Sequence, residues 1–148
     1  MSEESDPSGI RSIAVTADDV VTAAERTLRS TDEVVLRVTP PYAGRMRARI
    51  HRVREGEYSV TDAESDDPVP VHVDPTELIA ELPTYPEPEE TEDDLRSASE
   101  REYTPERHRE YHQQVVEDWR EAVRDRIVDE TTLEWDGGRK RVAVKRLG

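Results

Sequence analysis

The stretch Glu33–Val53 constrains the fold most, because two alternating runs of residues flank a short turn rich in proline. Alternation places six apolar side chains on one face: Val34, Leu36, Val38, Met46, Ala48 and Ile50. It places four arginines on the other face: Arg37, Arg45, Arg47 and Arg49. A period of two predicts strands with one face buried and the other exposed to water. We therefore expect a β-hairpin that turns at Pro40–Gly44 and carries a positively charged outer face.

The remaining patterns predict an α+β domain around this hairpin. We expect an antiparallel β-meander of about four strands, which includes further strands at 58–61 and 69–73. Residues 16–29 and 104–129 have apolar side chains at helical spacing. These N-terminal and long C-terminal helices are expected to pack the sheet on one face. A C-terminal β-hairpin is expected within 131–147, turned at the glycines that follow Asp136.

Composition divides this single domain into four segments. Residues 1–10 are predicted to be a disordered acidic tail, and residues 11–82 to be the α+β core. Residues 83–103 are rich in proline and acidic side chains, which predicts a linker or a strap across the surface. Residues 104–148 add the long helix and the C-terminal hairpin to the same domain.

Three shorter signals lie inside the core segment. Ile13–Val15 is expected to be a short strand or only a lead-in to the first helix. Pro70 favours an edge position for the strand at 69–73, because proline cannot donate a ladder hydrogen bond. Asp74 followed by Pro75 opens a predicted short helix that ends at Leu82.

The charge balance is strongly acidic. The chain has 35 Asp and Glu against 21 Lys and Arg, a net charge of -14, and contains no Cys. The missing thiols exclude disulfides, thiolate catalysis and a cysteine-based zinc site. No signal peptide or membrane span is expected, so we predict a cytoplasmic protein. Such acidity is typical of haloarchaeal proteins, in which molar salt screens repulsion between surface carboxylates.

The chain also resembles a family of small haloarchaeal proteins for which no function is established. Three stretches carry the resemblance: TPPYAGRMRARIH, VDPTEL and HREYHQQVVEDWREAV. It would extend from about Val15 to Gly148. The resemblance implies a lineage and a cytoplasmic setting, and it brings no catalytic or binding residue with it.

Two basic stretches are the first candidate site. The segments Arg45–Arg54 and Arg139–Arg146 each hold five basic residues and no acidic one. Side by side on one sheet they would suit phosphates, with Arg45, Arg47, Arg49, Arg141 and Lys145 as binding residues. High salt disfavours a purely electrostatic contact with nucleic acid, and a protein partner is the other external candidate.

Internal pairing of these arginines, or a plain solvated face, is the favoured alternative. Residues 55–95 contain 15 acidic side chains and no Lys or Arg, so part of this segment could cover the basic strands. A nucleic-acid site requires Arg47 and Arg49 to face the same way as Arg141 and Lys145, uncovered by the acidic segment. A structure in which Glu87–Asp94 lies over these arginines would count against it.

Tyr42, in the turn of the first hairpin, is a further candidate contact residue. The alternative, favoured by two consecutive prolines before it, is a rigid turn with Tyr42 folded back on the sheet.

A histidine pair is the candidate metal site. His108 and His112 lie four residues apart on the long helix, and His51 or His72 could complete a ligand set. The order HREYH is not the HExxH pattern of metalloproteases. The alternative is that both rings pack against the sheet as hydrogen-bonded, partly buried aromatics.

No motif of a known enzyme class is present: the chain has no phosphate-binding glycine loop and no nucleophile elbow. We therefore expect no catalysis and no cofactor. The favoured function is a non-catalytic protein-interaction or accessory module, with nucleic-acid binding and metal binding as alternatives. The sequence does not fix the partner or the oligomeric state.

Overall fold

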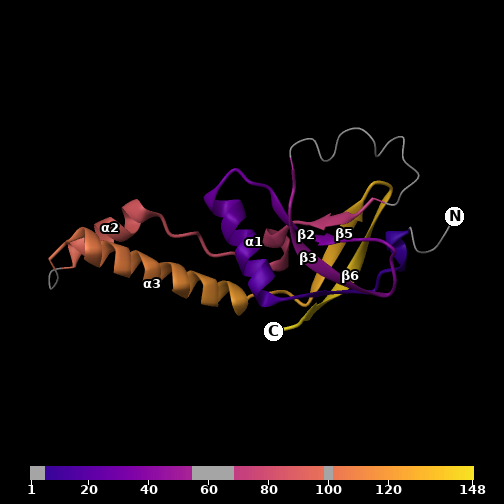
Figure 1. Cartoon of the computed structure of the whole chain (residues 1–148). Helices are drawn as coiled ribbons and strands as arrows, with labels where there is room; N and C mark the ends of the chain where they lie inside the picture. The colour runs from indigo at the N-terminus through magenta and orange to yellow at the C-terminus, as the bar shows by residue number, and fades with distance from the viewer. Residues whose placement is uncertain (1–5, 55–68, 99–101) are drawn as a thin grey trace.

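The six strands form one mixed sheet that curves until its two edge strands contact each other, which gives a nearly closed barrel (Figure 1). The computed structural model describes residues 6–54, 69–98 and 102–148. The strands are β1 (Ser12–Val15), β2 (Val34–Val38), β3 (Arg45–Arg52), β4 (Val71–Val73), β5 (Glu130–Trp135) and β6 (Gly138–Arg146). The helices are α1 (Ala17–Arg29), α2 (Pro88–Ser97) and α3 (Pro105–Arg124), with 3-10 turns η2 (Pro7–Gly9) and η4 (Pro75–Leu78).

The expected antiparallel meander of about four strands is wrong. The strand order is β4-β2-β3-β1-β6-β5, and β1 lies between β3 and β6, parallel to both. A four-residue strand carries too little alternation to reveal its place, and its partner β6 lies more than a hundred residues later in the chain. Because β6 pairs with β1, the C-terminal hairpin extends the same sheet.

The central hairpin follows the predicted alternation. In the β2–β3 pair, Leu36 lies opposite Ile50 and Arg37 lies opposite Arg49. The apolar set points into the barrel, where Leu36 and Ala48 are fully buried. β4 lies at one end of the strand order, the edge position that Pro70 indicates.

α1 packs beside the barrel on β2, β3, η4 and α3. Its N-cap is Thr16, whose hydroxyl accepts a hydrogen bond from the backbone N–H of Asp19. Asp18 and Asp19 lie in the first turn and Arg29 in the last, which suits the helix dipole. Its buried apolar face joins the barrel interior in one core, which includes Ile13, Val15, Val20, Leu36, Val123, Leu133 and Val144.

α2 and the N-terminal half of α3 form a helical arm that projects from the barrel (Figure 1). The expected linker at 83–103 therefore contains a ten-residue helix, α2. α3 begins after Thr104, whose hydroxyl accepts from the N–H of Arg107. Trp119 and Val123, near the C-terminal end of α3, join the main core and anchor the arm.

Two other predicted elements differ in extent. The helix expected from Pro75 to Leu82 is the single turn η4, after which Ile79 forms an isolated bridge with Ile127. Residues 6–10, expected to belong to a disordered tail, contain η2 and fully bury Ile10. The expected strand at 58–61 lies outside the described residues. Within the described ranges, no helix has the length and apolar character needed to cross a membrane.

Candidate functional site

The outward side of the barrel carries a group of basic side chains that we call the arginine face. It comprises Arg37 on β2, Arg45, Arg47 and Arg49 on β3, and Lys145 on β6. The arginines of β3 repeat every two residues, so their Cα atoms are spaced by roughly 7 Å along the strand. Alternation that buries Ala48 inside the barrel therefore aligns these charges outside it.

The strand register brings β6 into the same face. Ala14 on β1 pairs with Arg47 on one side and with Lys145 on the other. Ser12 likewise lies between Arg45 and Ala143. Because β1 contributes only small outward side chains here, the basic residues of β3 and β6 flank a low floor roughly 10 Å wide.

The basic side chains of this face are largely unpaired. Arg45, Arg47, Arg49 and Lys145 make no ion pair with any residue that the structure describes. The Nε atoms of Arg37 and Arg47 are shielded from solvent and have no acceptor among the described residues. Desolvated donors without acceptors cost free energy.

Other basic residues of the two sequence stretches are already engaged. Arg141 also points outward, but its guanidinium group binds Glu130 at 3.0 Å. Lys140 donates to the carbonyl of Ser8 at 2.8 Å. The structure thus brings Arg45, Arg47, Arg49 and Lys145 to one face, on which no described residue forms an ion pair with them.

Two histidines border the arginine face. His72 on β4 pairs in register with Arg37, and its ring lies 5.6 Å from that of His51 on β3. A guanidinium nitrogen of Arg37 lies 3.1 Å from Nε2 of His51. These histidines belong to the barrel, whereas His108 and His112 belong to the arm, so the four do not form one ligand set.

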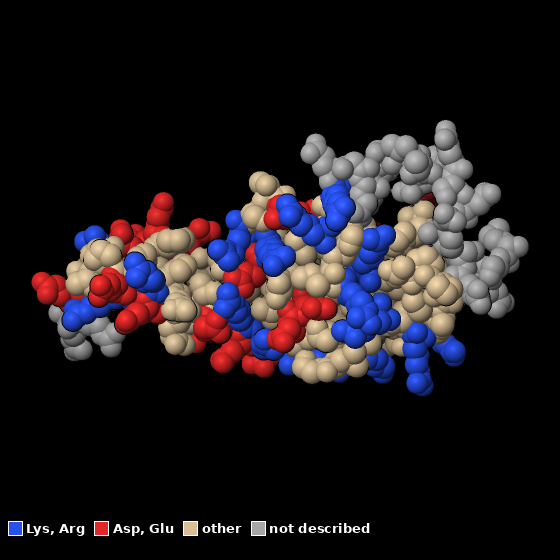
Figure 2. All heavy atoms as spheres, in the orientation of Figure 1, with Lys and Arg blue, Asp and Glu red and all other residues tan. Residues whose placement is uncertain are grey.

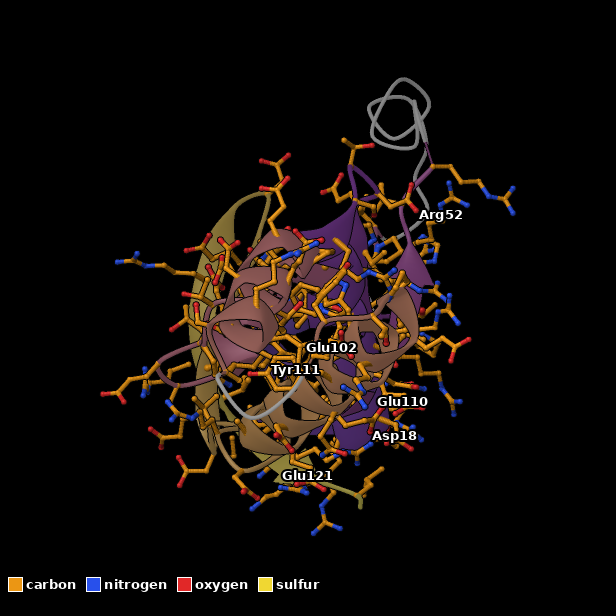
Figure 3. All side chains as sticks on the ribbon, turned by 90° about the vertical axis from the view of Figure 1, so that its left-hand side faces the viewer. Asp18, Arg52, Glu102, Glu110, Tyr111 and Glu121 are labelled. Carbon is orange, nitrogen blue, oxygen red and sulfur yellow. The ribbon has the colours of Figure 1, made fainter. Side chains whose placement is uncertain are left out.

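The described acidic side chains gather elsewhere. Glu87–Asp94 comprises the N-cap and most of α2. This helix packs on α3 at the far end of the arm and does not cover the arginine face (Figure 1). Figure 2 shows Lys and Arg over the strands at the right and most Asp and Glu over the helices to the left. Figure 3, viewed from the arm, shows the acidic Asp18, Glu110 and Glu121 on this helical side. Residues 55–68, which hold six of the 15 acidic side chains of the segment proposed as a cover, lie outside the described residues.

Tyr42 is folded back onto the barrel and is 5% exposed. Its hydroxyl donates to the carbonyl of Val69 at 2.6 Å. Burial raises the pKa of Tyr42 to about 12, so the phenol stays protonated and keeps this bond. Tyr42 therefore ties the turn to the segment that enters β4, and does not project to a partner.

His108 and His112 contact α2 and do not pack against the sheet as expected. The Thr91 hydroxyl lies 2.9 Å from Nε2 of His108 and 2.9 Å from Nδ1 of His112. Nε2 of His108 also lies 3.0 Å from the carbonyl of Pro88. Among the described residues, no group of three or more His, Cys, Asp or Glu is arranged to hold a metal ion. The pair thus fastens α2 to α3 through Thr91.

Sequence reasoning missed a second polar centre at the base of the arm. Glu25 on α1 is 6% exposed and accepts from Nε of Arg120 at 2.7 Å and Nη2 of Arg120 at 2.9 Å. The Tyr85 hydroxyl donates to the same carboxylate at 3.0 Å. The hydrogen bonds from Arg120, more than any other cause, hold the pKa of Glu25 below its ordinary value. A charged residue between Val21 and Leu28, on the apolar side of the helix, was the available signal.

An open groove of about 570 Å³ runs from this centre along α3 to the histidines. α1 supplies Glu25 and Arg29 to its wall, and α3 supplies a row of side chains from Pro105 to Arg120. Tyr85 and Tyr103, from the segments on either side of α2, complete the lining. The groove lies on the helical side of the molecule, apart from the arginine face.

Comparison with known proteins identifies a family but no function. Residues 1–148 match the model of a family described as a domain of unknown function, DUF8009. The chain therefore belongs to this family. No curated protein and no solved structure shows significant similarity to it.

Proposed function

We propose that this member of the DUF8009 family is a non-catalytic binding module that holds the phosphate backbone of a nucleic acid on its arginine face. The observation that supports the proposal is the row formed by Arg45, Arg47 and Arg49, extended across Ala14 to Lys145. These cations have no acidic partner among the described residues. Arg47 and Arg49 face the same way as Lys145, and Glu87–Asp94 does not lie over them.

Arginine suits this role because its planar guanidinium group binds a phosphate through two parallel hydrogen bonds. The pleat holds the three arginines of β3 on one line, while Ser12 and Ala14 keep the floor beside them low. Backbone contacts of this kind position a nucleic acid without selecting its sequence. We therefore expect binding with little sequence preference.

A protein partner, the function favoured by composition, suits this face less well. Protein interfaces are anchored by buried aromatic or large apolar side chains. The large apolar residues exposed in the described part of the chain are Leu28, Val69 and Leu147, and none belongs to the arginine face. The aromatic residue nearest to it in the hairpin, Tyr42, is buried.

The net charge of -14 opposes binding only at long range. At physiological ionic strength the Debye length is about 8 Å, so a phosphate on β3 responds mainly to the adjacent arginines. From the composition we further propose a cytoplasmic, haloarchaeal setting. Molar salt would weaken phosphate contacts, so the salt range over which binding persists decides whether this function operates there.

The test is fluorescence anisotropy with labelled single-stranded and duplex oligonucleotides of mixed sequence, titrated from low to high KCl. Three to four phosphate contacts predict that log K falls with log [KCl] with a slope of about -2 to -3 for single strands. Poly-glutamate of equal chain length serves as the competitor. Absence of binding at low salt, or equal displacement by poly-glutamate, would contradict the proposal and favour an acidic protein partner.

A further inference from the structure

We propose that the groove between α1 and α3 is a second binding site, which takes a small multivalent oxyanion such as a pyrophosphate or a polycarboxylate. The site is independent of the arginine face. Its evidence is the convergence of Arg29, Arg109 and His112 on one groove whose single carboxylate, Glu25, is already neutralised.

The carboxylate of Glu25 is saturated. It accepts two short hydrogen bonds from Arg120, one from Tyr85 and a longer one of 3.5 Å from Arg29. A carboxylate with this many donors has little capacity left for a cationic ligand. The groove therefore does not favour a metal ion or an amine.

The unused charge in the groove is positive. The remaining guanidinium nitrogen of Arg120 forms an ion pair with Glu117. Arg120 therefore lines the groove and positions Glu25, and it is not available to a ligand. Arg29 is held only by the 3.5 Å contact with Glu25, and its side chain is 60% exposed. Arg109 is exposed and has no hydrogen bond or ion pair with any described residue. Two guanidinium groups thus remain available to a ligand, which is the arrangement that oxyanions require.

His112 can add a donor to the same wall. The carbonyl of Pro88 can accept only from a protonated nitrogen or hydroxyl, and Nε2 of His108 lies 3.0 Å from it. The Thr91 hydroxyl competes for that carbonyl at 3.0 Å, and its single proton goes to Nδ1 of His112 when Nε2–H of His108 is the donor to Pro88 instead. His112 then carries its proton on Nε2, which has no partner among the described residues. An anion in the groove selects this tautomer because it needs a donor there.

The dimensions favour a small ligand. A volume of about 570 Å³ lies within the range of small-molecule sites, and the groove is open along one side. Tyr103, whose ring is covered by the guanidinium group of Arg96 at 3.7 Å, belongs to the lining, as does the Glu25 centre.

The test is isothermal titration calorimetry with inorganic pyrophosphate and, separately, with citrate, at an ionic strength held constant with KCl. We expect binding of at least one probe, weakened about tenfold or more in Arg109→Gln and in His112→Gln, because each loses a hydrogen bond to an ionised group. Which probe binds distinguishes a phosphate ligand from a carboxylate ligand. Circular dichroism verifies that both variants keep the native helix content.

Arg139→Gln is the matched control, because it removes the same charge at an exposed position on β6, outside the groove. It should leave the affinity unchanged. On binding, the side-chain ¹⁵N resonances of His112 should shift toward the tautomer protonated at Nε2. Lack of binding by both probes, equal affinity in Arg109→Gln, or an equal loss in Arg139→Gln would overturn the proposal.

Discussion

Arg120 on α3 donates to both carboxylate oxygens of Glu25 on α1, at 2.7 and 2.9 Å, across 95 residues of sequence. This pair joins the base of the helical arm to the helix that packs on the barrel. Tyr85 adds a third donor, and its ring meets the edge of Trp119 with centroids 4.9 Å apart. Arm and barrel are thus connected by a buried polar contact within apolar surroundings.

Glu25→Gln should lower the free energy of unfolding at pH 7 by about 2 kcal/mol, because Arg120 then loses its anionic partner. The effect should depend on pH. The pKa of Glu25 is held below 4.5 in the folded protein, so its stabilising contribution is complete above that value and is lost as pH falls through the lower folded pKa. Chemical denaturation at several pH values measures this difference.

The difference between wild type and Glu25→Gln should therefore shrink as the pH falls below 4.5. Glu121→Gln, an exposed change on α3, is the control and should have a small effect at every pH. A constant difference between wild type and Glu25→Gln down to about pH 3 would show that the charge of Glu25 contributes nothing.

Thr91→Val should loosen the arm without unfolding the barrel. Thr91 is 2% exposed, and valine keeps its shape while removing the hydroxyl between His108 and His112. Losing these bonds should cost about 1–3 kcal/mol locally. Hydrogen exchange should show faster exchange of the α2 amides and unchanged protection of β1.

The matched control for this change is Thr22→Val, since Thr22 is an exposed threonine on α1. It should leave α2 exchange unaltered. Equal acceleration in both variants, or unchanged α2 exchange in Thr91→Val, would refute the role assigned to the Thr91 hydroxyl.

Gly137→Ala should destabilise the C-terminal hairpin by about 1–2 kcal/mol. Gly137 has φ of 107°, a conformation that residues with a Cβ rarely adopt. Thermal unfolding compares it with Gly9→Ala, where an added Cβ would meet no atom within 4 Å and the backbone imposes no such strain. Gly9→Ala should be close to neutral, and equal stability of both variants would contradict the hairpin geometry.

Local patterns predicted the parts of this fold that depend on neighbouring residues. The alternation around Ala48 identified the β2–β3 hairpin and its outward arginines, and Thr16 and Thr104 marked the starts of α1 and α3. The place of β1 could not be found, because both of its partners are distant in sequence and parallel pairing leaves no turn signal.

The candidate sites also combine features that local patterns predict with contacts between residues distant in sequence. Alternation placed Arg45, Arg47 and Arg49 on one face, but only the strand register brings Lys145 beside them and pairs Arg141 with Glu130. The spacing of His108 and His112 indicated a shared ligand, and the structure places the Thr91 hydroxyl between them. The spacing of His108 and His112 could not predict this contact, because Thr91 belongs to α2, within the segment expected to be a linker or strap.

The most direct test of nucleic-acid binding is the salt dependence of oligonucleotide affinity in two charge-matched double variants. Arg47→Gln with Arg49→Gln removes two cations from the arginine face, and Arg26→Gln with Arg107→Gln removes two from exposed positions on α1 and α3 outside the groove. We predict that the first pair weakens binding and reduces the slope of log K against log [KCl] by about 1.4 for a single strand, while the second pair changes neither. Equal effects of the two pairs, or an unchanged slope in the first, would contradict the assignment of phosphate binding to the arginine face.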